Sequence, residues 1–172
     1  QSVAVDGTGN VVTTGYFSGT VNFGGSDLVS AGVDDIYLAK YSPNGVHQWS
    51  QRFGGTAYDY AYGIALDGSG SILVTGRFQG TTNLGGGNLV CAGGTDIYIA
   101  RYAASGAHQW SKRIGDTGYD LGWSVAFDGS GHAFVTGYFE GTVDFGGGGL
   151  LSIGADNTST TFSSNVSNAR NA

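Results

Sequence analysis

Apolar and polar residues alternate along short stretches of this chain. In Ser2–Asp6 the side chains of Val3 and Val5 fall on one face of an extended segment and Ala4 on the other. Glycine and small polar residues separate such stretches, as in Gly7–Asn10, where they allow a tight hairpin turn. This pattern predicts an all-β chain of short antiparallel strands.

The same pattern returns every 61 residues. Asp6, Asp67 and Asp128 stand 61 residues apart and open the matching turns DGTGN, DGSGS and DGSGH. The motif HQWS recurs at the same distance with Trp49 and Trp110. Landmarks that match over a period of this length indicate one supersecondary unit repeated along the chain.

Each complete repeat contains four expected strands. In the first repeat these are Ser2–Asp6, Val11–Phe17, Ile36–Tyr41 and His47–Phe53. In the second they are Gly63–Asp67, Ile72–Phe78, Ile97–Tyr102 and His108–Ile114, and the third begins with Ser124–Asp128 and Ala133–Phe139. Four short strands rich in β-branched and aromatic residues are typical of one β-propeller blade, a four-stranded antiparallel sheet.

Ser18–Asp35 lengthens the first blade between its second and third strands. It contains TVNF, a glycine turn and LVSAG, and the other repeats carry similar segments. This composition predicts an extra hairpin. We expect the hairpin to project from the blade and to add surface to it.

The segments VAVDGTGNVVTTGYF, DDIYLAKYSPNG and HQWSQRFGG resemble the SBBP-type β-propeller repeats of secreted bacterial proteins. The first hairpin and the short last turn are also similar to NHL-type blades, and the resemblance covers residues 2 to about 157. It implies a propeller fold and an exported bacterial protein, but little about activity, because a fold does not determine a function. The NHL similarity implies that the first strand lines the central channel and that the Trp-bearing strand is outermost.

The repeat loses its apolar alternation after Asn157. We therefore predict blade 1 at 2–63, blade 2 at 64–124, a partial blade 3 at 125–157, and a polar tail at 158–172 that is irregular or disordered, with an irregular edge strand as the alternative. Propellers close with about four to eight blades, so these roughly 2.5 blades form an incomplete ring. We expect further blades from a longer parent chain or from homo-oligomer copies; a stable open arc is the third alternative. The chain has no methionine, which favours a processed or longer protein.

Charge narrows the range of partners. Only 12% of the residues are charged, the net charge is −6, and the basic residues are scattered along the chain. A chain without a basic stripe is not expected to bind nucleic acid. No apolar run approaches the about 20 residues that span a bilayer, so we expect no membrane insertion. Cys91 has no partner cysteine and is expected to be a small packed residue.

Acidic residues in the expected loops are the first candidate contacts. Asp34, Asp35, Asp59, Asp96 and Asp120 recur between repeats. Recurrence favours a structural role, such as bonding backbone amides of the neighbouring blade. The alternative is a ring of carboxylates that binds cations or sugar hydroxyls. Trp123 is a further candidate, because it stands where the second repeat has a tyrosine.

No catalytic, cofactor or metal site is predicted. The turn that Asp6 opens lacks the second and third carboxylates of a calcium loop, so this residue is expected to bond its own turn. One histidine per blade, such as His47, does not form a metal site unless blades converge. The glycine runs do not join a strand to a helix, which excludes phosphate loops.

These observations favour a non-enzymatic module, secreted or on the bacterial cell surface, that binds protein or carbohydrate or serves as a structural scaffold. The alternative is a fragment of a propeller hydrolase or lyase whose active site lies on missing blades. That alternative requires polar residues that break the repeat, such as Arg77 where the other repeats have Tyr16 and Tyr138.

Overall fold

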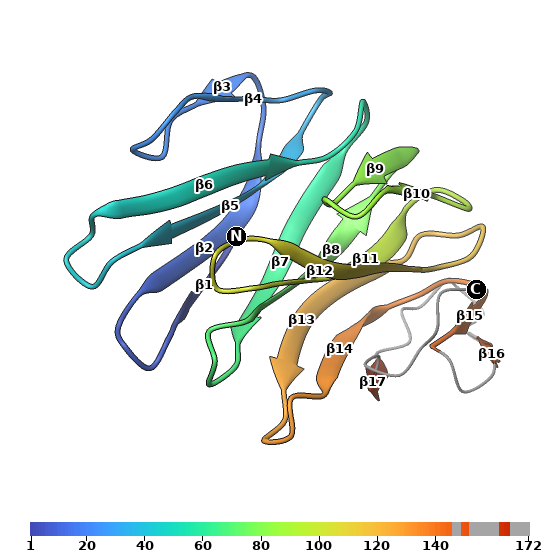
Figure 1. Cartoon of the computed structure of the whole chain (residues 1–172). Coiled ribbons are helices and arrows are strands. Elements are labelled where there is room, and N and C mark those ends of the chain that lie inside the picture. The colour runs from blue at the N-terminus through green and yellow to red at the C-terminus, as the bar shows by residue number, and fades with distance from the viewer. Residues whose placement is uncertain (146–148, 152–161, 166–172) are drawn as a thin grey trace.

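Three β-sheets stand side by side in the computed structural model, which describes residues 1–145, 149–151 and 162–165 (Figure 1). Blade 1 has the strand order β1-β2-β5-β6, formed by β1 (Ser2–Val5), β2 (Val11–Phe17), β5 (Asp35–Tyr41) and β6 (His47–Phe53). Blade 2 repeats this order with β7 (Asp59–Leu66), β8 (Ile72–Phe78), β11 (Asp96–Tyr102) and β12 (His108–Ile114). All pairings are antiparallel. The predicted all-β fold of four-stranded blades is confirmed.

The domain boundaries need correction. The predicted divisions after residues 63 and 124 fall inside β7 and β13 (Leu121–Phe127). Each of these strands contains a bulge, between Ala61 and Gly63 in β7 and between Gly122 and Ser124 in β13. A bulge inserts one residue and reverses the alternation of apolar and polar side chains. The residues before each bulge therefore do not continue the alternation that follows it, and the sequence pattern placed the start of the strand too late.

Blade 3 keeps its inner hairpin and takes its third strand from the tail. β13 pairs with β14 (Ala133–Tyr138), and β17 (Phe162–Asn165) pairs with the other edge of β14. At 162–165 the tail forms the edge strand that was the alternative, in place of the irregular or disordered tail, while 158–161 and 166–172 lie outside the described residues. Phe162 pairs with Gly137, although its counterpart Arg101 in blade 2 pairs with Leu73. A backbone ladder requires no apolar side chains, but register does depend on their pattern.

Every blade contains the predicted extra hairpin. The strand pairs are β3 (Thr20–Val21) with β4 (Leu28–Val29), β9 (Thr81–Asn83) with β10 (Asn88–Val90), and β15 (Thr142–Asp144) with β16 (Gly149–Leu151). The expected projection is wrong, because the hairpin folds back over its own sheet. In blade 2 the side chain of Leu84 is fully buried, and the Tyr102 hydroxyl donates to the Leu84 carbonyl at 3.0 Å. The large aromatic side chains of β11, the third strand of blade 2, therefore pack against the hairpin and hold it on the sheet.

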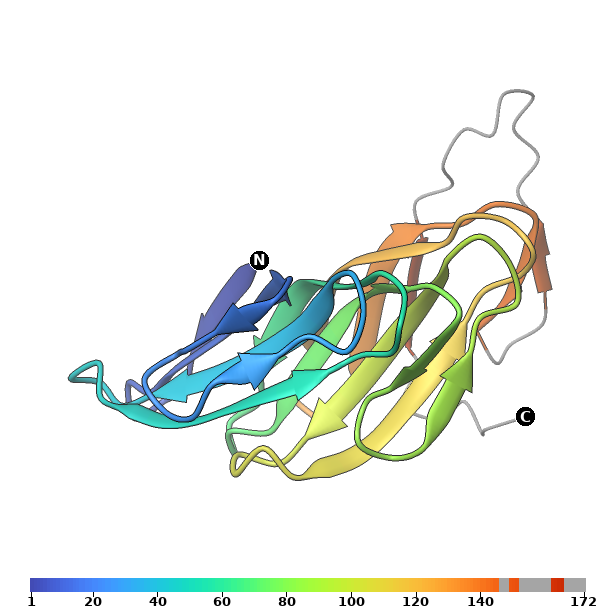
Figure 2. The same cartoon turned by 90° about the horizontal axis from the view of Figure 1, so that it is seen from above.

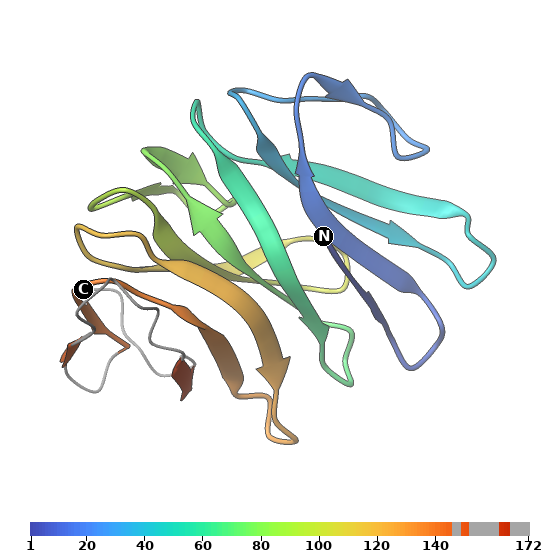
Figure 3. The ribbon, with the colours of Figure 1, turned by 180° about the vertical axis from the view of Figure 1, so that it is seen from behind.

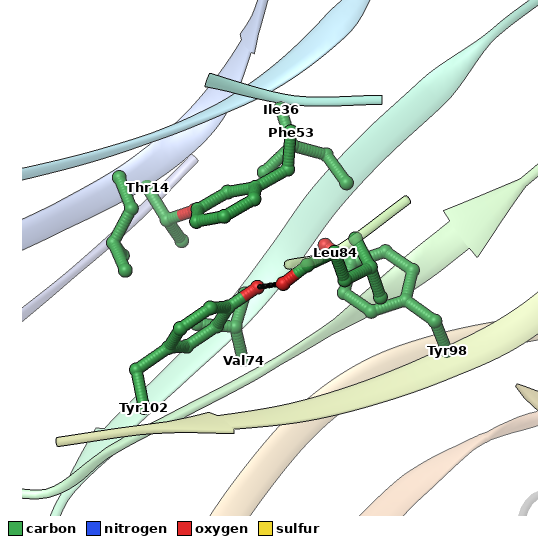
Figure 4. Close-up of a pocket in the computed structure, with 8 residues that line it drawn as sticks. Thr14, Ile36, Phe53, Val74, Leu84, Tyr98 and Tyr102 are labelled. Atoms are coloured by element: carbon green, nitrogen blue, oxygen red, sulfur yellow. Dashed lines mark hydrogen bonds between the residues drawn. The ribbon is translucent and has the colours of Figure 1, made fainter. Parts of the chain in front are cut away.

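The hydrophobic core lies between the blades. Val12, Leu38 and Phe53 of blade 1 pack with one face of blade 2, and Leu84 and Tyr98 complete that cluster. The opposite face of blade 2 packs on blade 3 in the same way. The gap between blades 1 and 2 is too narrow for a water molecule (Figure 4). A blade with two neighbours is thus buried on both faces, which explains why every residue of β8 except Arg77 is buried.

The inner and outer strands lie on opposite sides of the row of blades. Viewed from above, β6 and β12 run along one side, and β1 and β13 along the other (Figure 2). From behind, the innermost strands β7 and β13 face the viewer (Figure 3). The part of the chain that the structure describes contains no helix capable of spanning a membrane.

Candidate functional site

Four of the predicted contact residues are buried at the blade junctions. Asp35, Asp59, Asp96 and Asp120 have no exposed surface. Each accepts a backbone N–H of its own loop, as in the bonds from Ala31 to Asp35 at 2.7 Å and from Gly55 to Asp59 at 2.7 Å. Asp96 and Asp120 repeat this arrangement with the N–H groups of Ala92 and Asp116. The structure therefore places these four carboxylates in loop closure, away from solvent.

The buried carboxylates form pairs across each blade boundary. A Cβ atom added to Gly54 would lie 2.5 Å from Asp35 Oδ1 and 3.1 Å from Asp59 Oδ2, so the two groups flank one glycine. Arg52 donates to Asp35 Oδ2 at 2.6 Å. Burial raises the pKa of Asp59 to about 6, and the negative charge of Asp35 acts in the same direction. A single arginine thus lies near both carboxyl groups and bonds directly to Asp35. The other group, Asp59, keeps its proton up to a higher pH than an ordinary aspartic acid does.

The junction between blades 2 and 3 has the same design. Gly115 separates Asp96 from Asp120, and Arg113 donates to Asp96 at 2.6 Å. Burial raises the pKa of Asp120 to about 6 as well. Within the described ranges, no group of three or more His, Cys, Asp or Glu side chains is placed to hold a metal ion.

The hairpin aspartates bond their own turns, as predicted. Asp6 Oδ1 accepts the backbone N–H groups of Thr8 and Asn10, both at 2.9 Å. Hydrogen bonds from the Asn10 and Thr8 side chains hold the pKa of Asp6 below its usual value. In blade 3 the Asn10 position is His132, whose Nδ1 lies 2.7 Å from Asp128 Oδ2. The carboxylate oxygens are occupied locally, which argues against the calcium alternative.

Trp123 belongs to a surface that we call the aromatic row, and Asp34, the remaining predicted contact, borders that surface. Its members are Tyr16, Tyr58, Tyr60, Tyr62, Trp123 and Tyr138, with Arg77 among them. Ring centroids are 4.3 Å apart for Tyr16 and Tyr60, and 5.4 Å apart for Tyr62 and Trp123. The remaining neighbours are separated by 6.1 to 6.4 Å. The rings form one unbroken series from blade 1 to blade 3.

Local backbone geometry positions the row. Tyr58 forms a parallel bridge with Asp34 just before β7 begins. Tyr60 stands opposite Arg77 in the β7–β8 ladder, so both side chains share a face. Tyr62 and Trp123 occupy the bulges of β7 and β13. Bulges redirect a side chain, and here they place an extra ring on the inner strand of each blade.

Arg77 is the cation of the row. Its guanidinium carbon lies 4.8 Å from the centre of the Tyr60 ring. Among the described residues its Nε is buried without a hydrogen-bond partner. The other arginines of residues 1–145 each form an ion pair with an aspartate: Arg52 with Asp35, Arg101 with Asp67, and Arg113 with Asp96. No such pair within these residues involves Arg77.

The row is open to solvent and has a polar rim. Trp123 is 51% exposed, and Tyr16 and Tyr58 are also exposed. The Tyr60 hydroxyl donates to Asp34 Oδ2 at 2.8 Å. Burial and this hydrogen bond raise the pKa of Tyr60 to about 12, so its hydroxyl stays protonated at neutral pH. The arrangement can stack flat groups and bond polar ones.

Sequence reasoning missed most of the row. The residues that it did not select are Tyr16, Tyr58, Tyr60, Tyr62, Arg77 and Tyr138, although Arg77 was noted as a departure from the repeat. The available signal was the concentration of tyrosine at 58, 60 and 62, at alternate positions of one strand. The bulge at Tyr62, the last of these tyrosines, could not be predicted from the alternation of apolar and polar residues.

Comparison with known proteins supports the propeller repeat. Residues 48–77 match a family model described as SBBP, beta-propeller repeat. The matched stretch runs from β6 through β7 to β8, and therefore includes the central part of the aromatic row. The predicted resemblance to this repeat is confirmed.

A relative among the curated proteins carries a related description. It is a WD repeat-containing protein, L264, of Acanthamoeba polyphaga mimivirus, 24% identical over 197 aligned residues. The alignment covers 94% of this chain but 14% of that protein, so the chain spans a small part of its relative's length. WD repeats form propeller blades. Both comparisons thus describe this chain as similar to propeller-repeat proteins.

Proposed function

We infer that this protein is a non-enzymatic binding scaffold, exported from a bacterial cell or held on its surface, whose ligand surface is the aromatic row. The observation that carries the proposal is the unbroken series of half-buried and exposed rings across three blades. Tyr, Trp and Arg are enriched where proteins bind their ligands, because they combine a large apolar body with a polar tip. A carbohydrate or a protein is the class of ligand that such a surface fits.

The propeller hydrolase or lyase finds less support. Carboxyl groups with a pKa near 6 are suited to general acid–base catalysis, and Asp59 and Asp120 have this property. Both are fully buried in the blade junctions, where a substrate does not reach them. Their pKa is raised because the carboxyl groups close buried loops and are shielded from water.

The first prediction concerns Trp123. Its replacement by alanine should weaken ligand binding by about tenfold or more, as truncation of a central aromatic contact does, and should leave the melting temperature within about 2 °C, since the side chain is half exposed. Ligands identified on a glycan array and in a pull-down from the source organism would be titrated calorimetrically. Tyr119→Ala is the matched control, because Tyr119 is equally exposed but lies outside the row. Equal loss in both variants, or a blank array and pull-down, contradicts the proposal.

We also propose that the open face of blade 1 packs on another blade of the same repeat. Val3 and Val5 are both 62% exposed on β1, whereas Ile64, which stands 61 residues after Val3, is 9% exposed against blade 1. Adjacent exposed apolar side chains on a sheet face favour association. The additional blade can come from a longer parent chain or from a second copy.

Self-association of the isolated chain is the second prediction. Light scattering should give a mass above 17.6 kDa, and a Val3→Thr, Val5→Thr variant should shift the mass toward the monomer value because it makes the face polar. The control is Val46→Thr, an exposed valine in the turn between β5 and β6. A monomer of 17.6 kDa that unfolds cooperatively would show that copies do not complete the ring.

A further inference from the structure

We propose that the aromatic row binds a saccharide chain that carries carboxylate groups, and that Arg77 pairs with one of these carboxylates. The inference rests on the proposed binding function and specifies its ligand. Three features of the described residues support it: the unpaired charge of Arg77, the chemistry of the rings around it, and the departure of this position from the repeat.

Among the described residues, no ion pair balances the charge of Arg77. The side chain is half-buried, its Nε has no hydrogen-bond partner within the described residues, and no ion pair of residues 1–145 involves it. Its neighbours include three tyrosines, since it lies over Tyr60, and its charge lowers the pKa values of Tyr62 and Tyr138, which burial raises. The Asp34 carboxylate accepts the Tyr60 hydroxyl and forms no ion pair with Arg77 among the described residues. Removing a cation from water without a counter-ion costs free energy. A ligand carboxylate would offset that cost, because a guanidinium binds carboxylates with charge-assisted, often bidentate hydrogen bonds.

The rings around Arg77 fit a saccharide better than a peptide. The rings of the row belong to five tyrosines and one tryptophan. Such amphipathic rings present a flat apolar face and a polar edge, which matches the C–H faces and hydroxyl rim of a sugar ring. Asp34 and the Tyr60 hydroxyl add hydrogen-bonding groups beside the rings. Peptide partners are usually anchored by side chains inserted into apolar pockets, and the packed gap between blades 1 and 2 has no room for one.

Arg77 is also an exception within the repeat. The corresponding residues are Tyr16 in blade 1 and Tyr138 in blade 3, and both belong to the row. Only the middle blade therefore replaces a ring with a cation. The replacement places one positive charge near the centre of the series, where a ligand that spans the three blades would meet it.

The test compares one saccharide in charged and neutral form. Oligogalacturonate and its fully methyl-esterified counterpart share the same sugar rings, and only the first carries free carboxylates. Calorimetric titration of the full chain should show that oligogalacturonate binds about 10- to 100-fold more tightly, a difference typical of hydrogen bonds to a charged group. This preference should decrease with added salt.

Variants at position 77 then test whether Arg77 causes the preference for the charged saccharide. Arg77→Gln and Arg77→Tyr should bind the two forms equally, and Arg77→Tyr carries the residue of the flanking blades, which keeps the row intact. Lys112→Gln is the control, because it removes the same charge from the outer strand β12 and should retain the preference. Far-UV circular dichroism and thermal melting of each variant confirm that it is folded.

The outcomes separate this inference from the proposed function. Equal binding of both saccharides by the unmodified chain overturns the role of Arg77 but supports a carbohydrate-binding row. Binding of neither saccharide overturns the inference, and the array and pull-down described above then decide whether the row binds anything. Arg77-dependent binding of oligoglutamate as tight as that of oligogalacturonate overturns the saccharide assignment in favour of an acidic peptide.

Discussion

Replacing Leu84 by alanine should lower the free energy of unfolding by about 3 kcal/mol, within the range found for buried leucines. Leu84 belongs to the hairpin of blade 2 and is fully buried between two blades. It lines the packed gap between the two blades together with Thr14 and Phe53 of blade 1 and Tyr98 of blade 2 (Figure 4). Truncation would remove apolar contacts from both sheets and leave a void. Urea unfolding followed by tryptophan fluorescence measures the loss.

Phe23→Ala is the matched control for this experiment. Phe23 is the counterpart of Leu84 in blade 1, where it stacks on Tyr37 with ring centroids 4.3 Å apart. It is only half-buried, because no preceding blade covers it within the described structure. Its removal should cost about 1 kcal/mol, the value of one aromatic pair. An equal loss in the two variants would show that the hairpins stabilise only their own sheet and do not connect neighbouring blades.

Asp59→Asn should make the protein more stable at neutral pH, by up to about 3 kcal/mol for a change of two pKa units. The pKa of Asp59 is raised to about 6 from an ordinary value of 3.8. Between these two values the folded state holds more protons than the unfolded state, so stability falls as pH rises from about 4 to about 6 and then stays level. Asparagine carries no charge, yet keeps an oxygen that can accept the Gly55 N–H bond.

The stability difference between the variant and the unmodified chain isolates this effect. It should be near zero below pH 4, grow between pH 4 and pH 6, and remain constant above pH 6. The hairpin aspartates act in the opposite direction, because their lowered pKa values cost stability as pH falls, but they are present in both proteins. Asp27→Asn, in the exposed turn between β3 and β4, is the control for loss of a carboxyl group outside the blade junctions. A difference that does not vary with pH would mean that the pKa of Asp59 is the same in the folded and the unfolded state.

Much of the blade architecture could be predicted because it is local. The turn at Asp6 closes through bonds to residues at most four positions away, and the same turn recurs at Asp67 and Asp128. Alternating apolar residues in adjacent segments then specify antiparallel pairing within each sheet. The prediction was least accurate at the inner strands, where one extra residue in each bulge reverses the alternation.

The candidate site depends on contacts that no local pattern describes. Asp34 was selected as a loop residue, but its hydrogen bond to Tyr60 joins positions 26 residues apart. The buried pair of Asp35 and Asp59 likewise forms only when two blades meet. Recurrence between repeats marked these aspartates as important, and only the packing of the blades separated the half-buried Asp34 from the fully buried ones.

By itself, the sequence determined the 61-residue repeat, the four-stranded blade, the hairpin turns and the presence of an extra hairpin, because each of these follows from side-chain periodicity and turn chemistry within one segment. The tertiary structure decided that the extra hairpin of blade 2 packs between two blades and that Phe162–Asn165 adds a strand to blade 3. It also decided that the rings from Tyr16 to Tyr138 form one surface. These features require surfaces far apart in the chain to meet, and their geometry depends on how whole sheets pack.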